Sequence, residues 1–240
     1  MFQTLIIIPL SNALLFLTNL FFGNLGIAVI ILTILVKIIL FPLSLSTLKS
    51  QAALKKVQPL IDDIKKKYTD KNEQAIKIME LYKEHKANPL TGCLPLLIQL
   101  PIVIGLYQVF LRGDTSLSPD IMYSFIQIPE SISHMFFGID LREKSAFLAL
   151  VAGIAQYFQL YYSPIHTKKD DKKEKSTDPQ VIMMENMQKN LKYILPIMIV
   201  VFSFFTPSAI ALYLIISSIF TLIQEIIITK KISQYKNTLQ

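Results

Sequence analysis

Four long stretches of this chain carry almost no ionisable side chains, and they constrain its fold more than any other feature. Lys37 is the single Asp, Glu, Lys or Arg residue in 1–48, and residues 87–111, 145–167 and 193–224 contain none. A helix needs about 20 apolar residues to cross a hydrocarbon core about 30 Å thick. With 52% hydrophobic residues and a mean hydropathy of +0.47, the chain is predicted to be an all-α polytopic membrane protein.

The basic residues are distributed unevenly between these stretches. The net charge is +7, and ten lysines lie in 49–93 and seven in 168–192, whereas 112–144 holds three basic residues against five acidic ones. Because short loops rich in Lys and Arg stay on the cytoplasmic side, we expect 112–144 and the N-terminus outside and the C-terminus inside. Contact of the lysines with anionic lipid is favoured over contact with RNA, and no DNA partner is expected.

Residues 1–22 form an apolar segment that contains an uncharged polar stripe. Polar pairs recur about every seven residues: Gln3/Thr4, Ser11/Asn12 and Thr18/Asn19. This spacing places them on one helical face. We expect an amphipathic helix in the headgroup interface, with a membrane-spanning helix as the alternative. GNLG at 23–26 then breaks the pattern, and the core, 23–240, begins with a first span at about 26–48.

Residues 49–86 are predicted to form a cytoplasmic helical hairpin. Apolar residues at helical spacing mark the two arms: Val57, Leu60, Ile61, Ile64 and Tyr68 in the first, Ile76, Met79 and Tyr82 in the second. The sequence YTDKNE supplies the turn, with Asp70 or Asn72 as the N-cap of the second arm. Pro59 is expected to break or kink the first arm near its middle.

Four further spans are predicted after the hairpin. They are 92–111, 145–163, 192–206 and 208–229, with a solvated linker at 166–179. The last two divide one apolar run because Pro207 disfavours helical geometry at the preceding residue. We expect them to form a tight hairpin, whose first arm is only about 22 Å long and implies a locally thinned bilayer.

The sequence shows no catalytic constellation. Its three histidines are scattered, it has one cysteine, and it contains no HExxH, P-loop, GxGxxG or GxSxG motif. We therefore expect no catalytic residue, no metal site, no cofactor and no bond-breaking activity.

Lys37 is the most unusual residue of the predicted spans, because a charge near the bilayer centre costs about 2.5–3.5 kcal/mol. It lies about 10 Å above the inner boundary expected near Ser44, so a polar or wet site within the bundle is favoured over snorkelling. Uncharged polar residues could line that site, or could each bond a neighbouring helix. They are Thr33, Gln99, Gln156, Gln159, Ser203, Ser217 and Thr221. Glu225 is expected to reach the cytoplasmic interface, which leaves Lys37 without a neutralising acid.

Several blocks of the sequence resemble the YidC/Oxa/Albino family of membrane protein insertases. They are LVKIILFPL (35–43), VQPLIDDIKKKY (57–68), LYKEHKANPLTGCLPLLIQLPI (81–102) and the closing segment 178–224. NPLTGCLPLLIQLP is the most specific of them, being too long and irregular to arise from hydrophobicity. The resemblance covers about 24–229 and is to short bacterial forms without a large external domain. It implies five helices in the cytoplasmic membrane around a hydrophilic groove, open to the cytoplasm and to lipid.

The resemblance also implies roles for individual residues. Lys37 takes the place of the family's usual arginine as the groove cation, which keeps the charge but loses bidentate pairing. Gln156 or Gln159 lines the groove, and Leu214 stands where many members have tryptophan.

The chain is accordingly predicted to insert nascent membrane proteins and to help them fold. The hairpin Lys49–Lys86 is expected to contact the client or the ribosome, and a Sec translocon is a further expected partner. The basic C-terminal tail that serves ribosome binding in some relatives is short here. A small secondary transporter or channel for an anionic solute is the alternative.

Overall fold

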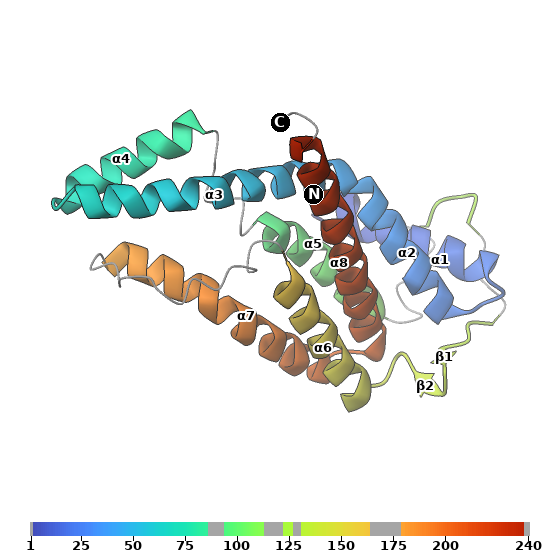
Figure 1. Cartoon of the computed structure of the whole chain (residues 1–240). Helices are drawn as coiled ribbons and strands as arrows, with labels where there is room; N and C mark the ends of the chain where they lie inside the picture. The colour runs from blue at the N-terminus through green and yellow to red at the C-terminus, as the bar shows by residue number, and fades with distance from the viewer. Residues whose placement is uncertain (1, 86–93, 113–121, 127–130, 164–178, 238–240) are drawn as a thin grey trace.

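The protein is built almost entirely from helices. The computed structural model describes residues 2–85, 94–112, 122–126, 131–163 and 179–237. The helices and strands, in chain order, are η1 (Gln3–Ile7), α1 (Ile8–Leu20), α2 (Leu25–Ile39), α3 (Phe41–Lys67), α4 (Lys71–Glu84), α5 (Leu94–Arg112), β1 (Met135–Phe136), β2 (Ile139–Asp140), α6 (Ala146–Tyr162), α7 (Pro179–Phe205) and α8 (Ser208–Asn237). The predicted all-α class is confirmed, with a small antiparallel ribbon, β1–β2, between α5 and α6 (Figure 1).

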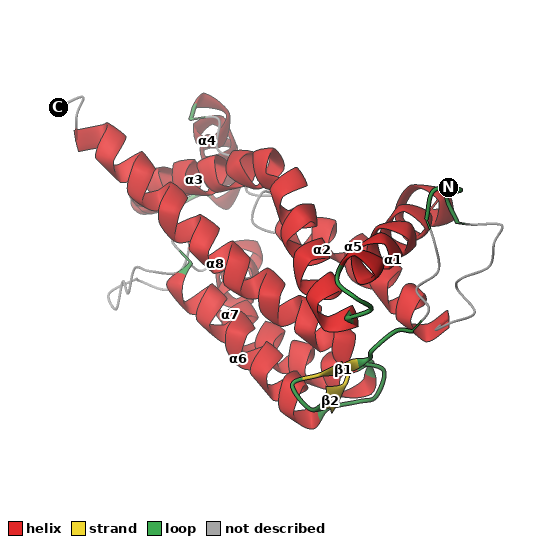
Figure 2. Ribbon diagram, turned by 90° about the vertical axis from the view of Figure 1, so that its right-hand side faces the viewer, coloured by secondary structure: helices red, strands yellow, loops and turns green. Residues whose placement is uncertain are grey.

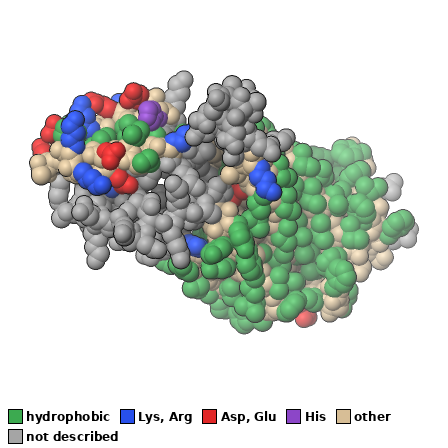
Figure 3. Space-filling model, in the orientation of Figure 1, with side chains coloured by type: hydrophobic (Ala, Val, Ile, Leu, Met, Phe, Trp, Pro, Cys, Tyr) green, Lys and Arg blue, Asp and Glu red, His purple; other side chains and the backbone are tan. Residues whose placement is uncertain are grey.

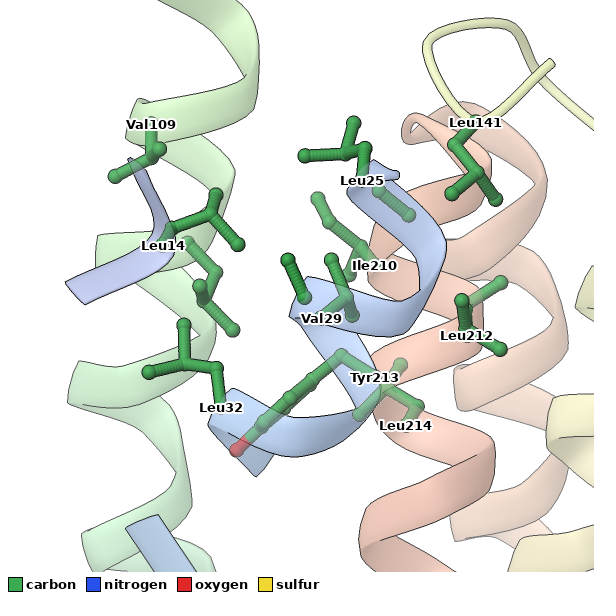
Figure 4. Packing of buried hydrophobic residues seen from close by; sticks show 14 of the residues in the cluster. Leu14, Leu25, Val29, Leu32, Val109, Leu141, Ile210, Leu212, Tyr213 and Leu214 are labelled. Carbon is green, nitrogen blue, oxygen red and sulfur yellow. The ribbon is translucent and has the colours of Figure 1, made fainter. Parts of the chain in front are cut away.

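Helix α8 lies at the centre of the bundle, in contact with α2, α5 and α6 (Figures 1 and 2). Its residues from Ala209 to Ile215 are all buried. Figure 4 shows side chains of several elements meeting around it: Leu14 of α1, Leu25, Val29 and Leu32 of α2, Val109 of α5, and Leu141 beyond β2. The first half of α8 is therefore enclosed by its neighbours, whereas Ile219 and Ile223 farther along the helix are exposed.

Two helices in the described residues are long and apolar enough to cross a membrane by themselves: Gln3–Leu20 and Ser208–Lys230. The bent pair Leu25–Ile39 and Phe41–Ser50 supplies a third candidate if it counts as one span. Three further apolar helices are shorter: Leu97–Phe110, Ala146–Tyr162 and Lys192–Phe205. The predicted polytopic membrane fold is confirmed, whereas the number of five spans stays a prediction.

The first predicted span, 26–48, is not one straight helix. Helix α2 ends at Ile39, and α3 begins at Phe41 with its axis turned by 57°. Pro42 lies in the first turn of α3, where its missing N–H leaves no helical bond unmade. Helix α3 then continues to Lys67, so the end of the predicted span and the first arm of the hairpin are a single helix.

Helices α3 and α4 form the predicted hairpin, which projects away from the bundle (Figure 1). Asp70 is the N-cap of α4, accepting the N–H of Asn72 at 3.0 Å. Val57 and Ile61 are buried against the second arm. Of the break or kink predicted at Pro59, the break is wrong, because α3 is continuous through this residue and packs against α4 on both sides of it.

The apolar stripe predicted for the second arm is also partly wrong. Ile76 and Met79 are 59% and 61% exposed, and α4 packs through Ile78, Leu81 and Tyr82 instead. Both sets of residues have helical spacing, so periodicity alone could not choose the face that meets α3.

The polar stripe of the first helix faces the protein at three of its positions. Ser11, Asn12 and Thr18 are 5%, 1% and 1% exposed, and Asn12 Oδ1 accepts the N–H of Tyr123 at 2.8 Å. Apolar residues are exposed instead: Leu5, Phe16 and Leu20. The predicted orientation toward headgroups is wrong for these three polar residues, because all three side chains are buried in the protein. Asn12 and Thr18 have hydrogen-bond partners there, whereas the Ser11 hydroxyl has none among the described residues.

The predicted break between the last two helices is confirmed, since α7 ends at Phe205 and α8 begins at Ser208. The two do not form a tight hairpin, because α6 packs extensively against both and they scarcely touch each other. The backbone N–H and the hydroxyl of Ser208 both donate to the carbonyl of Glu143, at 2.8 and 2.6 Å. Of the predicted linker 166–179, residues up to 178 lie outside the described part.

The segment that carries the β ribbon closes the end of the bundle opposite the α3–α4 hairpin (Figure 2). Ser133 donates its N–H to the carbonyl of Gly23 at 2.8 Å and accepts the N–H of Leu25 at 3.1 Å. Gly23 has a φ of +80°, and a Cβ there would lie 2.3 Å from the carbonyl oxygen of Ser131. Only glycine allows the two segments to approach this closely.

We expect Gly23→Ala to lower the thermal stability of the detergent-solubilised protein more than Gly138→Ala. Both glycines have a positive φ, which costs an alanine about 1–2 kcal/mol, but a Cβ at Gly138 meets nothing within 4 Å. The difference in melting temperature between the variants therefore reports the backbone contact. Equal losses would show that the contact can open without cost.

Candidate functional site

A row of polar side chains follows one stripe of α8 through the apolar bundle. Tyr213, Ser217, Thr221 and Glu225 are spaced by four residues, so each lies about one turn beyond the last. Along the helix axis, Tyr213 lies about 8 Å from Ser208, Thr221 about 20 Å and Glu225 about 26 Å. The row meets a different neighbouring helix at each level.

At the first level, Gln99 of α5 donates from Nε2 to the hydroxyl of Tyr213 at 2.7 Å. Tyr213 is 2% exposed, and its hydroxyl also hydrogen-bonds the side chain of Ser217. Figure 4 shows its ring crossing from α8 past α2. The buried polar atoms at this level are therefore satisfied by each other.

At the next level, α6 contributes a glutamine. Ser218, beside the row, donates from Oγ to Gln156 Oε1 at 3.2 Å. Gln159 is partly buried on the same helix, and within the described residues it makes no hydrogen bond to α8. Of the two glutamines between which the resemblance left a choice, the structure brings Gln156 to α8.

Lys37 occupies the third level. Its Nζ donates to Thr221 Oγ1 at 3.0 Å, while the Thr221 hydroxyl donates to the carbonyl of Ser217 at 2.8 Å. The threonine hydrogen is thus used within α8, and its lone pair faces the ammonium. Lys37 also lies in the last turn of α2, where the negative end of the helix dipole favours a cation.

Two of the predicted candidates lie apart from the row. Thr33 is 1% exposed, and its hydroxyl donates to the carbonyl of Val29 in its own helix at 2.6 Å. Ser203 is fully buried on α7, close to the turn into α8, and its Oγ has no partner among the described residues. The structure therefore groups Lys37, Ser217 and Thr221 and leaves these two residues away from them.

Glu225 is the residue of this site that the sequence reasoning missed. It is 8% exposed, interacts electrostatically with Lys37, and has a side-chain hydrogen bond with Ser163 at the end of α6. The expectation that Lys37 has no neutralising acid is wrong, because the Glu225 side chain is buried and acts on Lys37. The reach of Glu225 to the cytoplasmic interface stays a prediction. The sequence does contain a signal for its place in this site, because Glu225 continues the spacing of four residues that begins at Tyr213 and so lies on the same helix face.

The two described cavities lie elsewhere in the bundle. One is bordered by the first helix and Phe125, and the other is an apolar hollow between α6 and α7 beside Gly153. The described part of the chain holds no group of three His, Cys, Asp or Glu side chains that could bind a metal. The site is described by its polar contacts between helices.

We expect Thr221→Val to lower thermal stability more than Thr33→Val. The first change leaves a buried ammonium without its partner, and a hydrogen bond to a charged group contributes about 1.5–3 kcal/mol. The second removes a bond within one helix turn and preserves the side-chain shape. Comparing melting curves in one detergent tests this, and losses of the same size would mean that Lys37 finds another partner at no cost.

The sequence matches known proteins over nearly its whole length. A family model described as 60Kd inner membrane protein matches residues 16–236. Membrane protein insertase YidC of Fusobacterium nucleatum is 38% identical over 215 residues, 89% of this chain and 90% of that protein. Membrane protein insertase MisCA of Bacillus subtilis is 31% identical over 235 residues, 93% of this chain and 77% of that protein.

A third relative, membrane protein insertase YidC of Oceanobacillus iheyensis, is 30% identical over 233 residues, 95% of this chain and 83% of that protein. None of these names supports the transporter alternative. From the family match and these identities, the chain belongs to the YidC family of membrane protein insertases.

Proposed function

We propose that the protein inserts client proteins into a membrane, with Lys37 as the cation that receives their polar groups. Family membership carries the activity, and the contact between Lys37 and Thr221 inside an apolar bundle supports the role of the lysine. An ionisable residue at such a depth is costly and is a functional candidate for that reason.

The row on α8 gives a client polar partners within the bundle. A lysine ammonium has three N–H donors, and Thr221 uses one of them, so two are left for client carboxylates or carbonyls. Partition of the apolar client helix into lipid then supplies the driving force. The scheme breaks no covalent bond and uses no cofactor. Gln156, on the neighbouring helix, is positioned to extend the same polar surface.

Short apolar segments in the bundle would lower the barrier further. The apolar parts of α5 and α7, Leu97–Phe110 and Lys192–Phe205, each rise only about 21 Å, against a hydrocarbon core of about 30 Å. A bilayer that thins to meet them shortens the distance over which client polar groups must cross.

The α3–α4 hairpin would make the first contact with a client or a ribosome. Charged side chains gather over it, whereas hydrophobic side chains cover the bundle on the face in Figure 3. Among these charges, Leu60, Ile76 and Met79 are exposed. This mixed surface, within 49–86, suits both an apolar client segment and a polyanion. Residue 86 itself lies outside the described part, and a Sec translocon is proposed as a further partner.

The proposed orientation places the hairpin in the cytoplasm and the β ribbon outside. We expect a cysteine at Lys144 to react with an impermeant maleimide in intact cells, and a cysteine at Thr69 to react only after permeabilisation. Both side chains are exposed, and the one native cysteine, Cys93, is replaced by serine in each variant. The reverse labelling pattern would overturn the orientation and the lysine asymmetry on which it rests.

We expect Lys37→Arg to retain insertion and Lys37→Met to impair a client with an acidic flank about tenfold more than its matched amide client. That ratio corresponds to one charge-assisted hydrogen bond of about 1.5 kcal/mol. Protease protection of the two clients in proteoliposomes measures it. If Lys37→Met impairs both clients equally, the lysine is structural and not a receiving cation.

A further inference from the structure

Glu225 lies on α8 one turn beyond the threonine that holds Lys37. Because the two positions differ by four residues, they share a face of the helix. Glu225 is 8% exposed and Gln224 is 6% exposed, so the last part of the row is covered as thoroughly as its start. A carboxylate at this place requires a compensating group, since burying an isolated ion costs several kcal/mol.

The carboxylate is only partly satisfied. One side meets the hydroxyl of Ser163, whereas Oε2 has no hydrogen-bond partner among the described residues. Lys37 acts on it through space, and within the described part of the chain the two make no ion pair at 4.0 Å or less, because the ammonium is bonded to Thr221. Among the described acids, Glu225 is the one that acts on Lys37.

This geometry differs from a closed salt bridge. A closed pair would use the lysine donors and leave little for a client, whereas a counter-charge held at a distance neutralises the site and keeps the donors free. A client carboxylate that reaches Lys37 must therefore do so against the field of Glu225. A client ammonium would find an unoccupied carboxylate oxygen in the same place.

We propose that Glu225 is a specificity-determining residue of insertion, an internal counter-charge that limits the preference of the Lys37 site for acidic client segments. The proposal rests on the proposed role of Lys37 as the receiving cation. It assigns to the site two charges of opposite sign where the sequence suggested one cation.

A purely structural role for Glu225 is the competing explanation. In that case the carboxylate would only hold the end of α6 against α8 through Ser163. Glu225→Gln preserves the shape and an acceptor for Ser163, and Ser163→Ala removes the contact while leaving the charge. The two changes therefore separate charge from anchoring.

The test uses the full-length protein in proteoliposomes and three clients that differ at one flanking residue: glutamate, glutamine or lysine. We expect Glu225→Gln to raise the acidic-to-neutral insertion ratio about fivefold and to lower the basic-to-neutral ratio, as loss of one nearby charge requires. Ser163→Ala should leave both ratios unchanged. Equal effects of Glu225→Gln on all three clients would overturn the proposal.

A second comparison removes both charges, so that no uncompensated ammonium remains in the bundle if Glu225→Gln alone does not fold. In Lys37→Met the remaining carboxylate of Glu225 should repel the acidic client and lower the acidic-to-neutral insertion ratio. In Lys37→Met/Glu225→Gln this ratio should return to near one. If the acidic-to-neutral insertion ratio is the same in the double variant as in Lys37→Met, the role of Glu225 is refuted and that of Lys37 is not. If Lys37→Met itself shows no client dependence, the receiving role of Lys37 fails, which is a different result.

Discussion

The fixed position of α8 is the constraint on which the rest of the structure depends. The first N–H groups of a helix have no partner within it, and in α8 those of Ser208 and Ala209 bond to the carbonyls of Glu143 and Leu141. Leu141 is fully buried beside them. These bonds set both the depth and the rotation of α8, and hence the direction in which every polar residue of its row points.

The bend after α2 places Lys37 opposite that row. Helix α2 packs against α8, and the 57° turn at Leu40 carries α3 out of the bundle. Lys37 is left in the last turn of α2, the end of a helix that favours a cation, and its ammonium donates to Thr221. The same turn therefore forms the cationic site and starts the hairpin that projects from it.

Sequence reasoning located most helix ends but fewer helix faces. Charge gaps, the break at Pro207 and the Asp70 cap each depend on local chemistry, which the sequence contains directly. The face that a helix turns toward its neighbours does not depend on local chemistry alone. On α4 two faces had equally good spacing, and on the first helix the polar stripe could face headgroups or protein, so tertiary contacts decided both orientations. The burial of Glu225 was missed for the same reason. Its distance from the end of the span can be read from the sequence, but its contact with Ser163 at the end of α6 cannot.

The order of polar contacts along α8 favours insertion over transport. Near the β ribbon, Gln99 and Tyr213 satisfy each other, about 8 Å from the start of α8. The charged groups Lys37 and Glu225 lie toward the hairpin end, where each keeps hydrogen-bonding capacity unused within the described residues. In the proposed mechanism a polar client segment would be held from the hairpin side, and the mutually bonded Gln99 and Tyr213 would offer it no free partner nearer the β ribbon. A carrier needs polar sites that can open in turn to both sides, whereas an insertase needs only a polar site that releases its client sideways into lipid.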